Sequence, residues 1–267
     1  MQSLLIFGLG KMSGAMLAGW LAAGADPSRF SVLTRTPKQL PDGVQVFAGI
    51  EDAVAAAPHD RILLGFKPHQ LGELAEQVQS LSGPQTEIHS LLAGITLDQL
   101  QAAVPKAAAH LRVMPNLACE INKSPVILCE CGLDESAREG LFELYDQLGT
   151  AVWLEGETHF DLVTALAGSG PGFVYRFIDA LAEAAIELGL PAASAHGLAL
   201  ATVEGAAALA TQAEFSPREL ADRVASPGGM TREGLNVLDE DAALKVLLVK
   251  TLAAARDRGA ALSQDAG

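Results

Sequence analysis

The chain has 267 residues and 49% hydrophobic content, enough to bury a substantial core in one large domain or two smaller ones. Its 32 acidic residues outnumber its 18 basic ones, and the formal charge of -14 repels phosphate backbones, which argues against nucleic acid as a partner. We expect neither a signal peptide nor a membrane span. The apolar run over 3–9 is short and followed by a glycine turn, and the Ala-rich stretch over 192–213 contains Glu204.

The number and spacing of the cysteines indicate the cellular compartment of the protein. Of three cysteines, Cys129 and Cys131 form a C-x-C pair with no histidine nearby. A metal or redox role is one interpretation, but buried or incidental thiols fit such an isolated pair better, so we expect no metal site. A small and odd number of cysteines favours a reducing compartment, and the expected location is the cytoplasm.

Short apolar runs alternate with helix-like segments as far as residue 158. Alternation of this kind predicts a doubly wound parallel sheet with helices on both faces, the Rossmann-type α/β fold. We assign this fold to residues 1–158, with its first helix over 13–23. The expected strands cover 4–7, 30–34, 61–66, 87–92, 109–113, 124–129 and 151–154.

Ala/Leu-rich helical patterns replace the strand patterns over 159–267. The stretch over 192–213 carries one charged residue, and a helix that is apolar nearly all round must be buried. A domain of about 105 residues has too little core to hide it, so we expect a second subunit to cover it and assign 159–267 to an all-α dimerisation domain. The expected helices cover 160–167, 173–188, 193–212, 217–224, 231–238 and 242–258.

A glycine-rich turn follows the first expected strand and opens the first expected helix. Gly8 permits the tight turn, and Gly10 lets the backbone approach a pyrophosphate at the positive end of the helix. The third glycine of the G-x-G-x-x-G pattern should stand at position 13, but Ser13 stands there and Gly14 follows. A structural turn is the alternative, but the place directly after a strand favours a dinucleotide site.

The end of the second expected strand indicates which dinucleotide binds. NAD enzymes usually place an Asp or Glu about 20 residues after the glycine turn, where it binds the ribose 2′-hydroxyl. This chain has Thr34-Arg35-Thr36 at that point, with Lys38 behind and no acid. Because Arg35 would pair with a 2′-phosphate, NADP (as NADPH) is predicted over NAD. In the alternative, Arg35 and Lys38 are solvated loop charges.

Two further loops, over 65–69 and 92–96, end expected strands. Ligands of open parallel sheets bind beyond the carboxyl ends of the strands, so both loops should flank the nicotinamide. The residues expected to contact the cofactor are Phe7, Gly8, Leu9, Gly10, Lys11, Met12, Arg35, Gly65, Phe66, Lys67, Pro68, Ala93 and Gly94.

Two glycine-rich segments in the helical half, over 164–172 and 225–231, each lead into a helix. The N-terminus of a helix offers unpaired N–H groups and about half a positive charge, so such a loop can hold an anion. A substrate carboxylate would suit the second loop. The alternative is that both segments are simple turns between helices and bind nothing. The presence of both segments in a chain that also has a dinucleotide-binding pattern weakens this alternative.

Several motifs occur in one order along nearly the whole chain: the N-terminal glycine loop, Lys67-Pro68, Ala93-Gly94-Ile95-Thr96, Met114-Pro115-Asn116, the segment 164–183 with Gly189-Leu190-Pro191, and ASPGGMTREGLNVL over 225–238. Together, and above all through the S-P-G-G-x-T motif, they resemble the Δ1-pyrroline-5-carboxylate reductase family. The resemblance implies reduction of a cyclic imine, pyrroline-5-carboxylate, to L-proline, the last step of proline synthesis. It also implies a helical C-terminal domain that interlocks with a second subunit, giving homodimers that can build larger rings.

The same resemblance implies roles for individual residues. It places the substrate carboxylate on the backbone of Gly229, Met230 and Thr231, with help from Ser226. It also places the Thr231 hydroxyl near the ring nitrogen, where it could orient the imine or relay a proton. Four more residues match family positions around the pocket. Thr164 and Lys67 are expected to be catalytic together with Thr231. Glu157 and Glu214 are expected to bind substrate.

The chain departs from the family pattern at several positions. Leu117-Ala118 replaces the usual Thr-Pro after Met-Pro-Asn, and residues 119–123 replace a glycine-rich V-G-x-G segment. Asp52 replaces an asparagine near the adenine ribose, and Met230 replaces a smaller residue. These departures leave the predicted fold and cofactor intact, but they bear on substrate identity and on affinity for the adenosine half of the cofactor.

Rival functions differ in what they require of the sequence. A β-hydroxyacid dehydrogenase needs a catalytic lysine on a helix of the second domain, but no lysine lies between Lys123 and Lys245. A reductase of a related cyclic imine carboxylate, such as piperideine carboxylate, stays open. So does a non-catalytic NADP-sensing protein, although such a protein would have no need for the complete S-P-G-G-x-T loop.

Overall fold

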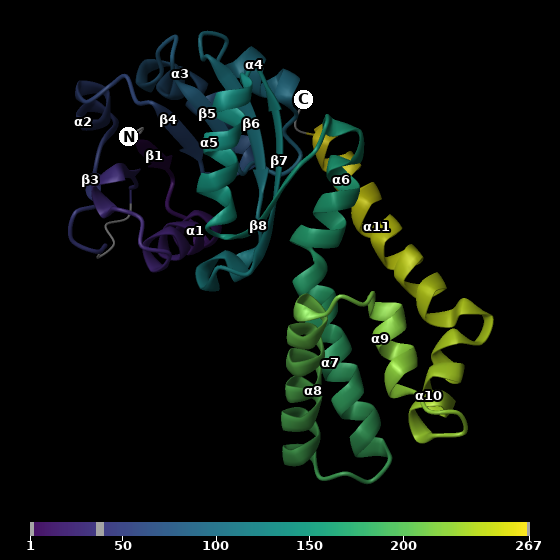
Figure 1. Cartoon of the computed structure of the whole chain (residues 1–267). Helices are drawn as coiled ribbons and strands as arrows, with labels where there is room; N and C mark the ends of the chain where they lie inside the picture. Colours follow the sequence, from purple (N-terminus) through teal and green to yellow (C-terminus); the bar gives the residue numbers. More distant parts are fainter. Residues whose placement is uncertain (1–2, 36–39, 266–267) are drawn as a thin grey trace. The chain divides into compact units, whose positions relative to one another are not determined.

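A computed structural model describes residues 3–35 and 40–265 of the chain, with side chains described as far as residue 261. The chain divides into an N-terminal unit, Met1–Gly168 with Ala255–Gly267, and a helical unit, Ser169–Ala254. Figure 1 shows the strands of the first unit and the helices of the second.

Within the described residues, the N-terminal unit contains an eight-stranded sheet in the order β3-β2-β1-β4-β5-β6-β7-β8. The first six strands in chain order run parallel to one another, as expected for a doubly wound sheet. The strands are β1 (Leu4–Phe7), β2 (Phe30–Leu33), β3 (Gln45–Phe47), β4 (Arg61–Leu64), β5 (Glu87–Ser90), β6 (Ala109–Met114), β7 (Ser124–Cys131) and β8 (Gly149–Trp153).

One strand breaks the expected parallel arrangement. β7 runs antiparallel to β6, with Met114 opposite Ile127, and β8 then runs parallel to β7. Only residues 115–123 join β6 to β7, and a connection this short cannot carry the chain back to the other end of the sheet, as a parallel strand would require. The sheet is therefore mostly parallel, as predicted, and mixed at this edge, where the sequence did not indicate the reversal of β7.

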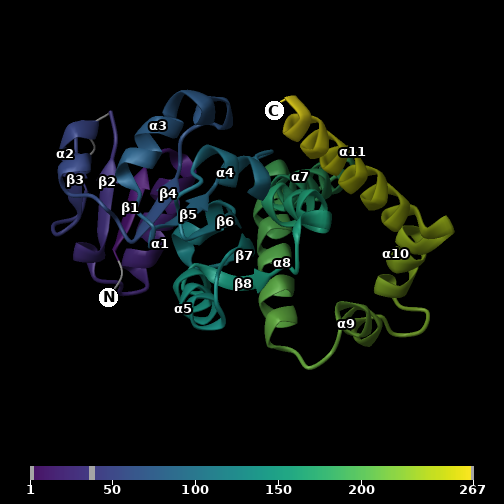
Figure 2. The ribbon, with the colours of Figure 1, turned by 90° about the horizontal axis from the view of Figure 1, so that it is seen from above.

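Both faces of the sheet are covered, as the alternating sequence pattern predicted. In β1, Leu4 and Ile6 belong to a core packed with helices α1 and α5, whereas Leu5 and Phe7 belong to a second core packed with α3 and α4. Figure 2 shows α3 and α5 on opposite sides of the strands. The helices of this unit are α1 (Lys11–Ala22), α2 (Ile50–Ala55), α3 (Leu71–Leu81), α4 (Leu97–Ala103), α5 (Glu135–Asp146) and α6 (Phe160–Val163), with short turns η1 (Pro27–Arg29), η2 (Pro68–Gln70), η3 (Leu117–Ile121) and η4 (Glu157–His159) and a π-turn η5 (Thr164–Gly168).

Most differences from the expected elements lie at strand ends. Strands were expected over 61–66 and 87–92, but β4 and β5 each end two residues earlier. The last two residues of each expected strand lie in a loop. Two elements, β3 and α2, have no matching prediction from the sequence. β3 is three residues long with two of them exposed, which is too short for an alternating pattern to be recognised.

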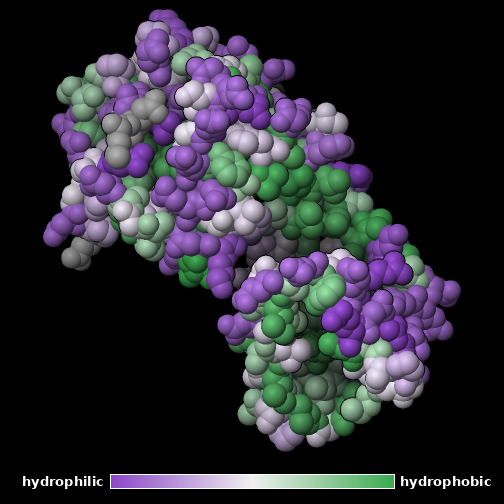
Figure 3. All heavy atoms as spheres, in the orientation of Figure 1, coloured by the Kyte–Doolittle hydropathy of each residue, from purple (hydrophilic) through white to green (hydrophobic). Residues whose placement is uncertain are grey.

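The helical unit consists of helices throughout its described residues, in agreement with the prediction. Its core lies between α7 and α8, where Ala182, Ala195 and Ala199 are buried. Many apolar side chains of α8 are exposed on the single chain, among them Leu198, Leu200 and Leu209, and Figure 3 shows apolar side chains gathered over this unit. The helices are α7 (Gly170–Glu187), α8 (Ala192–Gln212), α9 (Pro217–Val224), α10 (Met230–Asp239), the turn η6 (Glu240–Ala242) and α11 (Ala243–Asp265), of which residues up to Ala254 belong to this unit.

Among the described residues, each helix is too short or too polar to cross a lipid bilayer.

Candidate active site

A cleft of about 970 Å³ lies at the carboxyl ends of the parallel strands of the N-terminal unit. The ends of β1, β2 and β4 border it, which is where open parallel sheets hold their ligands. Its lining includes all the residues expected to contact the cofactor except Gly94. These lining residues are Phe7, Gly8, Leu9, Gly10, Lys11, Met12, Arg35, Gly65, Phe66, Lys67, Pro68 and Ala93.

The turn between β1 and α1 has the backbone that the glycine pattern predicted. Gly8 has a φ of +96°, and a Cβ placed on it would lie 2.9 Å from the backbone nitrogen of Phe66. Both the conformation and the lack of space therefore require glycine at this position. Gly10 is the N-cap residue of α1, so the N–H groups of the first helical turn open toward the cleft that this turn borders.

Ser13 occupies the place where the motif calls for a third glycine, and the structure gives it a role of its own. Its side chain is 1% exposed. Its hydroxyl donates to the Gly8 carbonyl (2.8 Å) and accepts from the Gly10 N–H (2.9 Å). A side chain at the third position of a helix that accepts from the N-cap N–H is half of a capping box, and this spacing is the signal that the sequence offered.

Arg35 lies at the carboxyl end of β2, exposed on the lining of the cleft, where a cation could reach a ribose phosphate. Lys38, which follows Arg35 in the sequence, lies outside the described residues. Asp52 is exposed on α2 and is not part of the described cleft lining.

The cleft has further walls that the sequence did not indicate. Some of their residues come from the β3–α2 connection and from α3, two places where position depends on packing rather than on a local motif. Leu117 belongs to η3, the segment where the chain departs from the family pattern. The additional lining residues are Leu33, Thr34, Ala48, Gly49, Ile50, Gln70, Leu74, Gln77, Leu91 and Leu117.

Thr164 opens the π-turn η5, and π-turns within helices often occur at functional sites. Its Oγ1 is buried and has no hydrogen-bond partner among the described residues. The turn is fixed from the sheet side, because Asn116 Nδ2 donates to the Ala167 carbonyl over 2.9 Å. A buried hydroxyl without a partner is unfavourable, so Thr164 is a candidate to hydrogen-bond a ligand.

Glu157 has partners within the N-terminal unit. Its carboxylate accepts from the Leu97 N–H at the start of α4 (3.1 and 3.2 Å) and pairs with Arg112 (2.5 Å). The Arg112 guanidinium lies 3.7 Å from the centre of the Phe160 ring. The structure thus gives Glu157 a cluster of internal contacts, whereas the sequence had suggested only a place beside the substrate.

The S-P-G-G-x-T loop belongs to the helical unit and ends at the N-terminus of α10. Gly229 is the N-cap residue of this helix, and its N–H donates to the Ser226 carbonyl over 2.9 Å. Thr231 is exposed in the first turn, and the Met230 side chain is 94% exposed. The structure therefore brings Ser226, Gly229, Met230 and Thr231 together on one helix N-terminus. Glu214 is exposed between α8 and α9.

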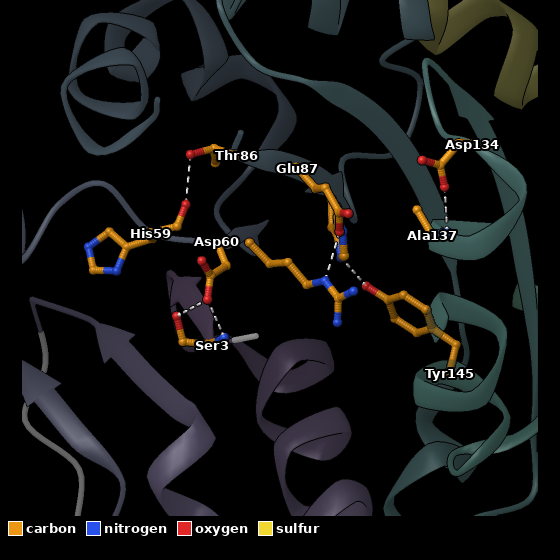
Figure 4. A network of polar contacts seen from close by, with 10 residues as sticks. Ser3, His59, Asp60, Thr86, Glu87, Asp134, Ala137 and Tyr145 are labelled. Carbon is orange, nitrogen blue, oxygen red and sulfur yellow. Dashed lines mark hydrogen bonds and ion pairs between the residues drawn. The ribbon is translucent and has the colours of Figure 1, made fainter. Parts of the chain in front are cut away.

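A buried polar network lies at the other end of the strands from the cleft. Arg61 and Glu87 face each other at the start of β4 and β5 and form an ion pair of 2.7 Å. His89 Nδ1 lies 2.7 Å from the Tyr145 hydroxyl, and its Nε2 lies 3.4 Å from Glu87 (Figure 4). Burial lowers the pKa of His89 and raises the pKa of Tyr145. Burial also opposes ionisation of Glu87, but His89 and Arg61 outweigh it and lower the pKa of that carboxyl.

Two family models match the chain. The model described as pyrroline-5-carboxylate reductase dimerisation matches residues 157–262. The model described as NADP oxidoreductase, coenzyme F420-dependent, matches residues 3–88. Together they cover the cleft-forming strands at one end of the chain and the helices at the other.

Known proteins resemble the chain over its whole length. It is 30% identical to a pyrroline-5-carboxylate reductase of Methanosarcina acetivorans, covering 98% of each chain, and 32% identical to pyrroline-5-carboxylate reductase 2 of Bacillus subtilis, covering 90% of this chain and 88% of the relative. The structure of the pyrroline-5-carboxylate reductase of Coxiella burnetii superposes with a TM-score of 0.90 at 30% identity over 98% of each chain. A Plasmodium falciparum pyrroline carboxylate reductase, solved with NADP bound, shares the fold with a TM-score of 0.81 at 22% identity over 98% of each chain. The chain belongs to the pyrroline-5-carboxylate reductase family.

Proposed function

We propose that this protein reduces the cyclic imine 1-pyrroline-5-carboxylate to L-proline with NADPH, the last step of proline biosynthesis. The observation that carries the proposal is a dinucleotide-sized cleft built on Gly8 and Gly10, in a chain that also has the complete S-P-G-G-x-T loop. A protein that only sensed NADP would need the first of these features and not the second. The family membership of the chain supports the same function.

The residues of the cleft fit NADPH. The turn that carries Gly8 and Gly10 lines the cleft, and the N-terminus of α1 that follows it supplies N–H donors for a pyrophosphate. Arg35 would pair with the 2′-phosphate, and the loops carrying Lys67 and Ala93 would flank the nicotinamide. When bound, NADPH supplies the hydride that reduces the C=N bond.

The chain's own residues then position the imine and its proton. The N–H groups of Gly229, Met230 and Thr231, with the Ser226 hydroxyl, hold the substrate carboxylate at the positive end of α10. The Thr231 hydroxyl orients the ring nitrogen and relays a proton to it from water. A protonated nitrogen makes the carbon a better hydride acceptor, since no nitrogen anion has to form.

Other predicted residues take supporting roles. Thr164 offers its buried, unpartnered hydroxyl to the bound molecules, and Lys67 adds a positive charge at the cleft. Glu214 lies in the helical unit with the S-P-G-G-x-T loop, beside which we place the substrate. Glu157 is a positioning residue, because Arg112 and the N-terminus of α4 hold its carboxylate.

The functional domains of this proposal are an NADP-binding domain over 1–158 and a dimerisation and substrate-binding domain over 159–267. The exposed leucines of α8 form an apolar surface that a second copy of the chain would cover, giving a homodimer or a larger homo-oligomer. The cytoplasm suits such a protein, since Cys119, Cys129 and Cys131 are free thiols in the structure.

A related cyclic imine carboxylate with a six-membered ring is the second candidate substrate, because the cleft and the S-P-G-G-x-T loop would serve either imine and the Met230 departure on that loop bears on which of them binds. The deciding experiment measures NADPH and NADH oxidation with pyrroline-5-carboxylate and with piperideine carboxylate, alongside mass in solution. Faster turnover of the five-membered ring with NADPH is expected. NADPH binding without oxidation of the cofactor by either imine would refute the enzymatic function.

A further inference from the structure

We propose that Ser13 is a positioning residue for the cofactor, whose hydroxyl holds the β1–α1 turn in its pyrophosphate-binding shape. This inference rests on the proposed function, because it presumes that NADPH occupies the cleft. The alternative is that Ser13 merely replaces the third glycine of the motif and that its hydroxyl has no role. In that case the side chain needs only to be small, so that the helix can pack closely on the strand.

The contacts of the Ser13 hydroxyl span the whole turn. The hydroxyl donates one hydrogen bond to the Gly8 carbonyl, five residues earlier in the chain, and accepts another from the Gly10 N–H. A Cβ placed on Gly65 would lie 2.4 Å from the Gly8 oxygen and 2.9 Å from Ser13 Oγ, so all three groups meet at one tightly packed point. The hydroxyl therefore braces the turn after β1 from within, at the point where the loop after β4 packs against that turn.

Two consequences follow for an anion in the cleft. The Gly8 carbonyl faces Ser13 and Gly65, which keeps its negative oxygen away from a bound pyrophosphate. The Gly10 N–H is already used by Ser13, so the pyrophosphate is received by the first-turn amides of α1 at Lys11 and Met12. Because Ser13 is buried, water cannot easily replace its hydroxyl once it is removed.

The test compares Ser13→Ala and Ser13→Gly, with NADPH binding followed by fluorescence. Both variants should raise the Kd for NADPH about tenfold, the effect of leaving a buried backbone group unpaired. The KM for the imine and kcat at saturating NADPH should change little. Inhibition by adenosine 2′-phosphate, which has no pyrophosphate, should be unaffected, and this is a result that general loss of structure would not give.

The matched control is Ser82→Ala. Ser82 also donates its hydroxyl to a backbone carbonyl, that of Val78 (2.6 Å), but it lies at the end of α3 and is not part of the described cleft lining. This variant should bind NADPH as the unmodified protein does. Wild-type affinity in Ser13→Gly would overturn the inference, because a glycine would then serve as well as the hydroxyl.

Hydrogen exchange of the Gly10 amide tests the same bond without a substitution. Slow exchange in the unmodified protein is expected, and exchange at the rate of an open amide would also overturn the inference. Failure of the inference and failure of the proposed function are distinguishable. If the unmodified protein neither binds NADPH nor reduces the imine, the function fails, whereas normal activity with unchanged Ser13 variants refutes only the role of Ser13.

Discussion

The internal contacts of Glu157 predict that its replacement damages stability first. In Glu157→Gln, Arg112 loses its anionic partner while its side chain stays buried, at 5% exposure. The same change weakens the contact with the Leu97 N–H at the start of α4. A residue that only touched substrate would leave the free energy of unfolding unchanged, so the two roles give different results.

The size of the effect follows from the burial of the two partners. Breaking a fully buried ion pair costs about 3–5 kcal/mol, because the remaining charge stays desolvated. The Glu157 side chain is 27% exposed, so water reaches part of the site. We therefore expect a loss of about 2–3 kcal/mol, a large part of the stability of a typical domain, which is about 5–15 kcal/mol.

The assay is urea unfolding followed by circular dichroism at one fixed protein concentration, since assembly would also contribute to stability. The control is Glu155→Gln. Glu155 also pairs with an arginine, Arg138, at 3.2 Å, but it is 85% exposed, and a surface pair of this kind contributes less than about 1 kcal/mol. If Glu157→Gln unfolds at the same urea concentration as the unmodified protein while the KM for the imine rises, the structural role is refuted and Glu157 is a substrate contact.

Three further predictions concern the cofactor, the imine and the pH. Arg35→Ala should raise the KM for NADPH about tenfold and leave the kinetics with NADH unchanged. A tenfold change is the lower end of the range expected for losing a charge-assisted hydrogen bond, because Arg35 is exposed. An unaltered NADPH-to-NADH preference would contradict this. Thr231→Ala should lower kcat about 100-fold, as expected for loss of a proton relay, without changing the Kd for NADPH, and unchanged kcat and KM would exclude its role. Burial lowers the pKa of His89 and His110 below the ordinary 6.5, so the folded protein keeps them neutral while the unfolded chain takes up protons. Stability should be fully present above pH about 6.5 and fall as the pH drops below it, and equal urea midpoints at pH about 7.5 and 5.5 would contradict this.

The cofactor turn could be predicted because its determinants are neighbours in the sequence. Gly8 and Gly10 follow an apolar run directly, and the structure places both at the mouth of the cleft. The role of Ser13 could not be read in the same way, since a pattern of glycines describes backbone freedom and not a hydrogen bond across the turn. A capping-box reading of its position would have come closer.

Features set by distant contacts were not predictable from the pattern. Alternation of apolar residues indicates a strand but not its direction, so the reversal at β7 followed only from the short connection before it. Leu117 lines the cleft because η3 is held by packing, with Cys119 so close to α1 that a Cβ on Gly19 would lie 2.1 Å from its carbonyl oxygen. For Glu157, family resemblance suggested a location near the substrate, but its partner Arg112 lies 45 residues earlier in the chain.

The π-turn at Thr164–Gly168 makes this part of the chain respond to a deletion differently from a regular helix. A π-turn pairs residue i with i+5, so it holds one residue more than an α-helical turn. Deleting a single residue from the turn would restore α-helical pairing and leave the two flanks nearly in register, because one α-helical turn would then replace one π-turn. A single deletion inside the regular helix α7 would instead rotate one flank by about 100° relative to the other. Single deletions within the π-turn should therefore disturb the fold less than single deletions within α7.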